Sequence, residues 1–159
     1  MTSHSLRYRT HSKFSVIVPT FGRAAHLRRC LAALEKQTRR PDDVVVVIRP
    51  EDEATGREVR SWRASSRLAV REAFVDRPGH ILPVIVGLRE VSGDVAALTD
   101  DDAEPYPDWL ERLERHYGTS DVGGVGGSLE EYVEEKRIEL PGIDRVGYLK
   151  WFGDYYGGF

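Results

Sequence analysis

Two short apolar runs separated by an amphipathic segment dominate the first third of the chain. Residues 14–19 and 44–48 are rich in β-branched side chains, which is typical of strands buried on both faces of a parallel sheet. Between them, Leu27, Leu31 and Leu34 recur at helical spacing, and charged residues occupy the opposite side. The pattern predicts a strand, a helix and a second strand that pack together.

The alternation of strand and helix continues beyond residue 50. Residues 81–91 contain β-branched side chains, but their spacing predicts a helix, with Pro83 tolerated in its first turn. Trp62 and Trp109 are predicted to lie in the core. The remaining predicted elements are a polar helix within 50–65, a strand at 68–75, a turn at 76–79, a strand at 95–99, a helix from about 109, and a glycine-rich strand at 122–127. This order predicts an α/β fold in which helices cover a mostly parallel sheet.

Composition supports one globular domain and shows an uneven charge. The chain has 159 residues, 40% of them hydrophobic, and a net charge of -3, which favours neither nucleic acid nor membrane as a partner. Residues 1–99 carry 17 Lys and Arg against 11 Asp and Glu, whereas residues 100–139 carry 4 against 13. We expect most of the acidic stretch to be a solvated face, and we predict no nucleic-acid partner.

The sequence also limits the compartment. Cys30 is the single cysteine, so there is no disulfide framework, and we expect it to be buried. No apolar stretch approaches the roughly 20 residues of a membrane span. Residues 1–13 are polar and basic, without the apolar segment of a signal peptide. We predict a disordered tail at 1–13 and a cytoplasmic location; contact of this tail with the inner face of an anionic membrane is the open alternative.

Three adjacent carboxylates, Asp100, Asp101 and Asp102, follow the predicted strand at 95–99. Like charges about 4 Å apart repel by about 1 kcal/mol in water, so the cluster indicates a bound cation. In open α/β sheets, ligands bind beyond the carboxyl ends of the strands. In an extended segment, Asp100 and Asp102 would point to the same side and suit Mg²⁺ or Mn²⁺. The pattern predicts a metal site for a phosphate-bearing ligand.

Other metal sites are not predicted. The sequence has five histidines, but no pair has the spacing of zinc ligands. The aspartates do not form an EF-hand either, because Pro105 occupies the sixth loop position, where that motif needs glycine.

Three segments combine into a specific pattern. They are Val16-Ile-Val-Pro-Thr-Phe-Gly-Arg23 with residues 27–34 and 37–38, then Pro41-Asp-Asp-Val-Val-Val-Val47, and then residues 87–92 with Gly93-Asp-Val-Ala-Ala-Leu-Thr-Asp-Asp-Asp102 and Pro107-Asp-Trp-Leu110. Together they resemble the N-terminal half of family-2 glycosyltransferases with the GT-A fold. The resemblance implies a Rossmann-like, nucleotide-sugar-binding half-domain over residues 14–128.

The resemblance further implies an activity and its residues. The activity is metal-dependent transfer of a sugar from a nucleoside-diphosphate sugar to an acceptor, inverting by direct displacement. Asp100 to Asp102 would form the DxD motif. The implied donor-binding residues are Pro19, Thr20, Arg23, Glu51, Asp52, Gly79, Asp100 and Asp101, and the implied ligands of Mg²⁺ or Mn²⁺ are Asp102 and Asp100. Glu51 or Asp52 would bind the base, and the acceptor is left as a glycan, a lipid or a small molecule.

The chain also departs from the family pattern. Arg49-Pro-Glu-Asp-Glu53 stands where the family often has Asp-Asp-Gly-Ser, and Pro83-Val-Ile85 where it often has Ala-Arg-Asn. Residues 129–159 are acidic and then aromatic-rich, and none matches the family's catalytic base; we interpret them as the start of a missing acceptor half. A sugar-nucleotide-binding module without turnover therefore stays open as an alternative. A receiver-like phosphoryl-transfer domain ranks last, because no lysine lies near residue 127.

Overall fold

The computed structural model describes residues 12–117 and 122–127, and the backbone of four short strands nearer the C-terminus. The chain divides into two units, Met1–Val122 and Gly123–Phe159. Residues 1–11 of the predicted tail and the predicted domain limit at Ser128 lie outside the described residues. None of the described helices is long and apolar enough to cross a membrane.

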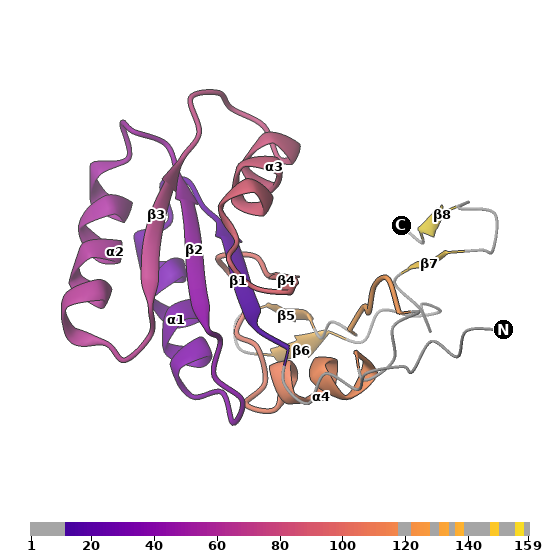
Figure 1. Cartoon of the computed structure of the whole chain (residues 1–159). Coiled ribbons are helices and arrows are strands. Elements are labelled where there is room, and N and C mark those ends of the chain that lie inside the picture. Colours follow the sequence, from indigo (N-terminus) through magenta and orange to yellow (C-terminus); the bar gives the residue numbers. More distant parts are fainter. Residues whose placement is uncertain are drawn as a thin grey trace, which may run out of the picture. The chain divides into compact units, whose positions relative to one another are not determined.

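The first unit is built on a four-stranded parallel sheet with the order β3-β2-β1-β4 (Figure 1). Its strands are β1 (Phe14–Pro19), β2 (Asp43–Ile48), β3 (Val70–Phe74) and β4 (Val95–Leu98). In register, Ile17 of β1 lies between Val45 of β2 and Leu98 of β4. This confirms the predicted α/β fold with parallel strands.

Helices cover both faces of this sheet. Figure 1 shows α1 (Ala24–Glu35) and α2 (Glu53–Ser65) on one face and α3 (Ile81–Glu90) on the other, with α4 (Trp109–His116) following β4. The strand order first runs outward from β1 to β3 and then returns past β1 to β4. Because β-α-β crossovers are right-handed, this change of direction places α3 on the face opposite to α1 and α2. The predicted helix at 81–91 is confirmed, with Pro83 in its first turn.

The hydrophobic core lies between the sheet and the helices on its two faces. The valines of β2 at positions 44–47 are fully buried, as expected for a strand covered on both faces. On one face α1 buries Leu27, Leu31 and Leu34 together with Cys30, which confirms the predicted stripe. On the other face, the side chains of α3 pack on a cluster made by Ile17, Val45, Val47, Ala73 and Val75.

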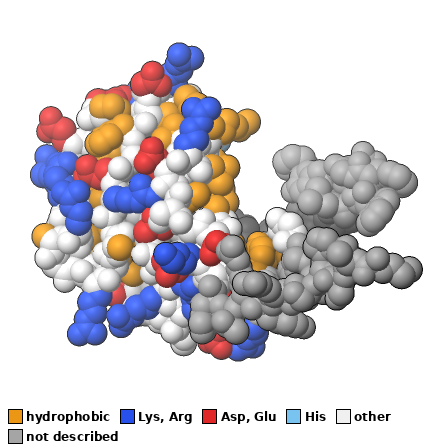
Figure 2. Space-filling view, in the orientation of Figure 1, with side chains coloured by type: hydrophobic (Ala, Val, Ile, Leu, Met, Phe, Trp, Pro, Cys, Tyr) orange, Lys and Arg blue, Asp and Glu red, His pale blue; other side chains and the backbone are white. Residues whose placement is uncertain are grey.

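The outer side of α3 is also apolar. Ile81, Ile85 and Leu88 recur at helical spacing and are 75%, 38% and 45% exposed. Hydrophobic side chains gather on the part of the surface where α3 lies (Figure 2). A helix that is apolar all round has a composition close to that of a buried strand, which explains the mixed signals of this segment.

Two expectations differ from the structure. Trp62 and Trp109 are half-buried rather than core residues. The indole Nε1–H of Trp62 donates to Glu58 at 3.1 Å, and this polar group is best satisfied near the surface. Residues 122–127 form no strand. Four of these six residues are glycines, which lose much backbone entropy on ordering and offer no side chain to pack.

Beyond residues 123–127, the second unit is described only by two pairs of short antiparallel strands. Strand β5 (Glu131–Val133) pairs antiparallel with β6 (Lys136–Ile138). Strand β7 (Gly147–Leu149) pairs in the same way with β8 (Tyr155–Gly157). The acidic and aromatic side chains of residues 129–159, which we interpret as the start of an acceptor half, lie outside the described side chains.

Asp52 fixes the start of α2. Its Oδ2 accepts hydrogen bonds from the Thr55 hydroxyl and from the backbone N–H of Gly22, both at 2.6 Å, and its Oδ1 accepts from the Thr55 N–H at 3.2 Å. The N-cap therefore also ties the loop after β1 to α2. Burial raises the pKa of Asp52, but these three bonds to the ionised carboxylate outweigh burial, and its net pKa is lowered.

Gly87 allows α3 to approach the sheet closely. A Cβ atom at this position would lie 2.4 Å from Cγ2 of Ile17 and 3.3 Å from Cγ2 of Val47. Both neighbours are fully buried and have no free space to move into. The distance between α3 and β1 thus depends on the missing side chain.

We predict that Gly87→Ala destabilises the protein by about 1–3 kcal/mol, because the clash with Ile17 exceeds the gain in helix propensity. Gly56→Ala is the matched control in α2, since its Cβ would meet only the flexible guanidinium of Arg60, at 3.1 Å. We expect the control to stabilise by up to about 1 kcal/mol. Urea unfolding followed by circular dichroism measures both; equal shifts would contradict the close approach.

We predict that Asp52→Asn makes stability less dependent on pH. The lowered pKa of Asp52 means that its charge stabilises the fold above the unfolded value of about 3.9, and that this contribution is lost as the pH falls through the folded pKa. Asparagine keeps an N-cap acceptor without the charge. The urea midpoints of native chain and variant should differ at pH 7 and converge below about pH 4. A gap of constant size across this range would refute the assignment.

Candidate functional site

The strand order reverses at β1, which has β2 on one side and β4 on the other. Loops that leave the sheet at such a point diverge and open a crevice, where α/β proteins bind ligands. Thr20 follows β1 here, and Asp101 follows β4. The Thr20 hydroxyl donates to Oδ2 of Asp101 at 2.6 Å, and the two residues are 8% and 4% exposed. This buried hydrogen bond joins the two loops at the carboxyl ends of β1 and β4.

Arg23 connects the same loop to two aspartates. Its Nη1 donates to Oδ1 of Asp101 at 3.2 Å and to Oδ2 of Asp102 at 3.0 Å. The hydrogen bond to Asp101, followed by the charges of both carboxylates, raises the pKa of Arg23, so the guanidinium stays charged. The side chains of Arg23 and Asp102 are about half exposed, at 54% and 51%. The site therefore holds one buried and one accessible carboxylate.

The aspartate segment is a turn rather than an extended chain. The N–H of Ala103 donates to the backbone oxygen of Asp100 at 3.2 Å. The alternation that would place Asp100 and Asp102 on one side therefore does not apply. Instead, Asp101 points inward to Thr20 while Asp102 stays at the surface. This separation reduces the repulsion that three adjacent carboxylates would otherwise have.

The structure brings some of the predicted residues together and leaves others apart. The connected group contains the predicted residues Thr20, Arg23, Asp52, Asp101 and Asp102, and Gly22, which was not predicted, joins it through its N–H bond to Asp52. Pro19 ends β1 beside it. Glu51 is exposed and pairs with Arg49, and Gly79 lies in an exposed turn with φ 134°. Within residues 12–117, no hydrogen bond or ion pair joins these two residues or the Asp100 carboxylate to the group.

Phe21 and Arg49 form a second feature at the same edge. The guanidinium of Arg49 lies over the ring of Phe21, 4.6 Å from its centroid. Phe21 is 53% exposed, so part of the ring remains accessible. The Nε of Arg49 is buried without a hydrogen-bond partner in the described part of the chain. The sequence pattern placed Arg49 only as a departure from the family and did not predict this contact.

Gln37 positions the segment that follows the aspartates. Its Oε1 accepts from the N–H of Leu110 at 3.1 Å, and its Nε2 donates to the backbone oxygen of Tyr106 at 2.7 Å. Thr38 adds a backbone hydrogen bond to Pro107 at 2.8 Å. Sequence reasoning gave these residues no role. The available signal was a polar amide directly after a core helix, because buried amides are nearly always hydrogen-bonded.

The accessible carboxylates of the aspartate turn suit a hard divalent cation that also binds a ligand. Within the described residues, no group of three or more His, Cys, Asp and Glu side chains is arranged to hold a metal ion alone. Mg²⁺ and Mn²⁺ commonly take one or two carboxylates, and phosphate oxygens and water complete the shell. Asp102, accessible at the turn, and the exposed Asp100 are oxygen donors of this kind.

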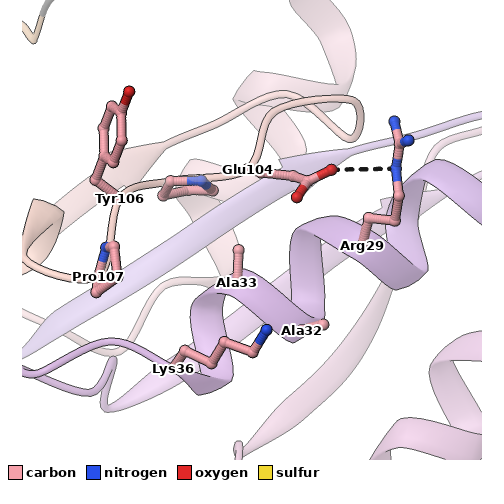
Figure 3. A pocket seen from close by; sticks show the side chains of 8 residues that line it. Arg29, Ala32, Ala33, Lys36, Glu104, Tyr106 and Pro107 are labelled. Atoms are coloured by element: carbon pink, nitrogen blue, oxygen red, sulfur yellow. Dashed lines mark ion pairs between the residues drawn. The ribbon is translucent and has the colours of Figure 1, made fainter. Parts of the chain in front are cut away.

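A separate hollow of about 410 Å³ lies between α1 and residues 104–107 (Figure 3). Arg29 and Glu104 point toward one another there and form an ion pair at 3.2 Å. The hollow shares no residue with the connected group at the ends of β1 and β4. We therefore place the candidate site at the strand ends and not in this hollow.

Comparison with known proteins places the chain in a family. The model of glycosyl transferase family 2 matches residues 15–155. Among curated relatives, the glycosyltransferase AglE of Haloferax volcanii is 26% identical over 118 residues, which cover 73% of this chain and 39% of that protein. The validoxylamine A glucosyltransferase of Streptomyces hygroscopicus subsp. limoneus is 29% identical over 157 residues, covering 88% and 34%.

Solved structures agree in fold. The mannosyltransferase PcManGT from Pyrobaculum calidifontis, in complex with GDP-Man and Mn²⁺, is similar with a TM-score of 0.60 and 25% identity, over 77% of this chain and 36% of that one. TarS from S. aureus, in complex with UDP-GlcNAc, is similar with a TM-score of 0.56 and 28% identity, over 65% and 30%.

The chain spans between about a third and a half of the length of the curated relatives it matches, with 39%, 47% and 34% covered. The family match itself covers most of the chain, and the parallel sheet agrees with it. The chain belongs to glycosyl transferase family 2 and has the GT-A type of α/β fold.

Proposed function

We propose that this chain provides the donor-binding part of a metal-dependent glycosyltransferase that uses a nucleoside-diphosphate sugar. The observation that carries the proposal is the Thr20–Asp101 hydrogen bond at the strand-order reversal, with the accessible Asp102 beside it. Support for the donor class comes from PcManGT, solved with GDP-Man and Mn²⁺, and from TarS, solved with UDP-GlcNAc.

The ends of β1 and β2 hold the nucleotide. Pro19 and Thr20 contact the base and ribose at the end of β1, and Gly79 approaches the donor from the loop between β3 and α3. Glu51 is the better candidate for the base contact, because its carboxylate is exposed. Asp52 already accepts three hydrogen bonds and is buried, so we assign it the positioning of the loop that carries Gly22.

The end of β4 holds the diphosphate through a divalent cation. Asp102, with Asp100, would ligate Mg²⁺ or Mn²⁺, while Asp101 orients Thr20 and supports the ribose side of the site. Bound there, the cation would supply neutralisation of the negative charge that develops on the leaving diphosphate. Arg23 adds a permanent positive charge at the same place.

The reaction class is an inverting displacement. The acceptor hydroxyl oxygen forms a bond to the anomeric carbon as the bond from that carbon to the diphosphate oxygen breaks. The proton of the hydroxyl passes to a base, which we assign to none of the described residues. The acceptor is a hydroxyl-bearing glycan, lipid or small molecule.

We predict that Asp102→Asn removes metal-dependent donor binding. Calorimetric titration of the native chain with UDP-glucose, UDP-GlcNAc and GDP-mannose should show binding of at least one donor that is strengthened by Mn²⁺. Loss of a charged ligand should weaken it by about tenfold or more. Asp108→Asn is the matched control, because Asp108 pairs with Arg112 and not with the aspartate group. Donor binding that ignores both Mn²⁺ and Asp102→Asn would refute the metal site.

Transfer is tested separately from binding. Release of the nucleoside diphosphate from the bound donor, measured with a panel of glycan, lipid and small-molecule acceptors, should rise with one acceptor class. Donor binding with no transfer across the whole panel would instead identify a sugar-nucleotide-binding module without turnover.

A further inference from the structure

Arg23 lies where a cation is expected. A single guanidinium nitrogen, Nη1, contacts both Asp101 and Asp102. We propose that Arg23 is an internal counter-ion, which holds the aspartate turn when no divalent cation is bound, leaves Asp102 when the cation binds, and then contacts the diphosphate of the donor. This inference rests on the proposed function, since it needs both the metal and the diphosphate.

The contact with Asp102 is of a kind that exchanges easily. Both side chains are about half exposed, and exposed ion pairs contribute little and are weakened by salt. Asp101 differs, because it is 4% exposed and also accepts the Thr20 hydroxyl at 2.6 Å. A divalent cation can therefore displace Arg23 from Asp102 without disturbing the buried Thr20–Asp101 hydrogen bond.

The charge balance favours this exchange. Three carboxylates and one guanidinium leave two negative charges at the turn, which is the charge that a divalent cation neutralises. The nearby arginines on α1 are engaged elsewhere, since Arg28 pairs with Glu58 at 2.7 Å and Arg29 pairs with Glu104 at 3.2 Å. Among the described residues, Arg23 is thus the arginine placed to compensate the aspartates.

The surroundings of Arg23 favour an anion once the guanidinium is released. Arg23 is the N-cap residue of α1, and the first turn of this helix has neither a side-chain cap nor an acidic residue. Free N–H groups and the helix dipole stabilise negative charge at such an end. A guanidinium binds phosphate oxygens with two parallel hydrogen bonds. The displaced side chain and the helix start would then bind the same diphosphate.

The test compares Arg23→Gln with Arg28→Gln, which removes the same charge from the same region without touching the aspartates. Affinity for Mn²⁺ alone is measured by electron paramagnetic resonance of the free ion, in the absence of nucleotide. We expect Arg23→Gln to bind Mn²⁺ roughly two- to fivefold more tightly than the native chain, and Arg28→Gln to stay close to it. Arg23→Lys, which keeps the charge, should lie near the native value.

The second measurement is nucleotide affinity, which should change in the opposite direction to Mn²⁺ affinity. At saturating Mn²⁺, we expect UDP and GDP to bind Arg23→Gln about tenfold more weakly than the native chain, since a charged hydrogen-bond donor is lost. Circular dichroism melting confirms that each variant is folded. Equal Mn²⁺ affinities for Arg23→Gln and Arg28→Gln, or unchanged nucleotide binding, would overturn the counter-ion role.

Asp102→Asn separates this inference from the proposed function. If Asp102→Asn leaves Mn²⁺ affinity unchanged, the metal site itself is wrong, whatever Arg23 does. If Asp102→Asn abolishes Mn²⁺ binding while Arg23→Gln has no effect, the metal site stands and the role of Arg23 is refuted.

Discussion

The arrangement of the site depends on one topological constraint, the reversal of strand order at β1. Because β2 and β4 flank this strand, the loop after β1 and the loop after β4 meet at the carboxyl end of the sheet, although some eighty residues separate them in the chain. The Thr20–Asp101 hydrogen bond joins these two loops, and Asp52 ties the first loop to α2 by accepting a hydrogen bond from the N–H of Gly22. A sheet whose strands followed in sequence order would separate these groups.

Electrostatics explains why the turn after β4 is tolerated. The three aspartates are not equivalent, because Asp101 is buried and hydrogen-bonded while Asp100 and Asp102 face solvent, where water screens their charge. Arg23 compensates part of what remains. The cluster is thus stable enough to persist in the folded chain, yet it keeps carboxylate oxygens accessible. The turn therefore has one buried, hydrogen-bonded carboxylate, Asp101, and one accessible carboxylate, Asp102.

Sequence periodicity predicted the sheet and its helices because burial on both faces leaves a direct record, as in the valine run of β2. It identified the aspartates but not their geometry, since a turn at 100–103 and an extended segment have the same composition. It predicted a strand at 122–127 from two valines, although the glycines there provide little to pack. The hydrogen bond from Gln37 to Tyr106 could not be predicted from periodicity, because the two residues lie about seventy positions apart in the chain.

The buried position of the single cysteine has a practical consequence. Cys30 lies on the inner side of α1 and is fully buried. Burial, followed by the charges of Asp101 and its neighbours, raises the pKa of the thiol to about 12. Because the thiolate is the reactive form, the folded chain should resist alkylation at neutral pH. The rate of thiol modification therefore reports how often the sheet and α1 come apart, so the protein carries its own probe of local opening, without an introduced label.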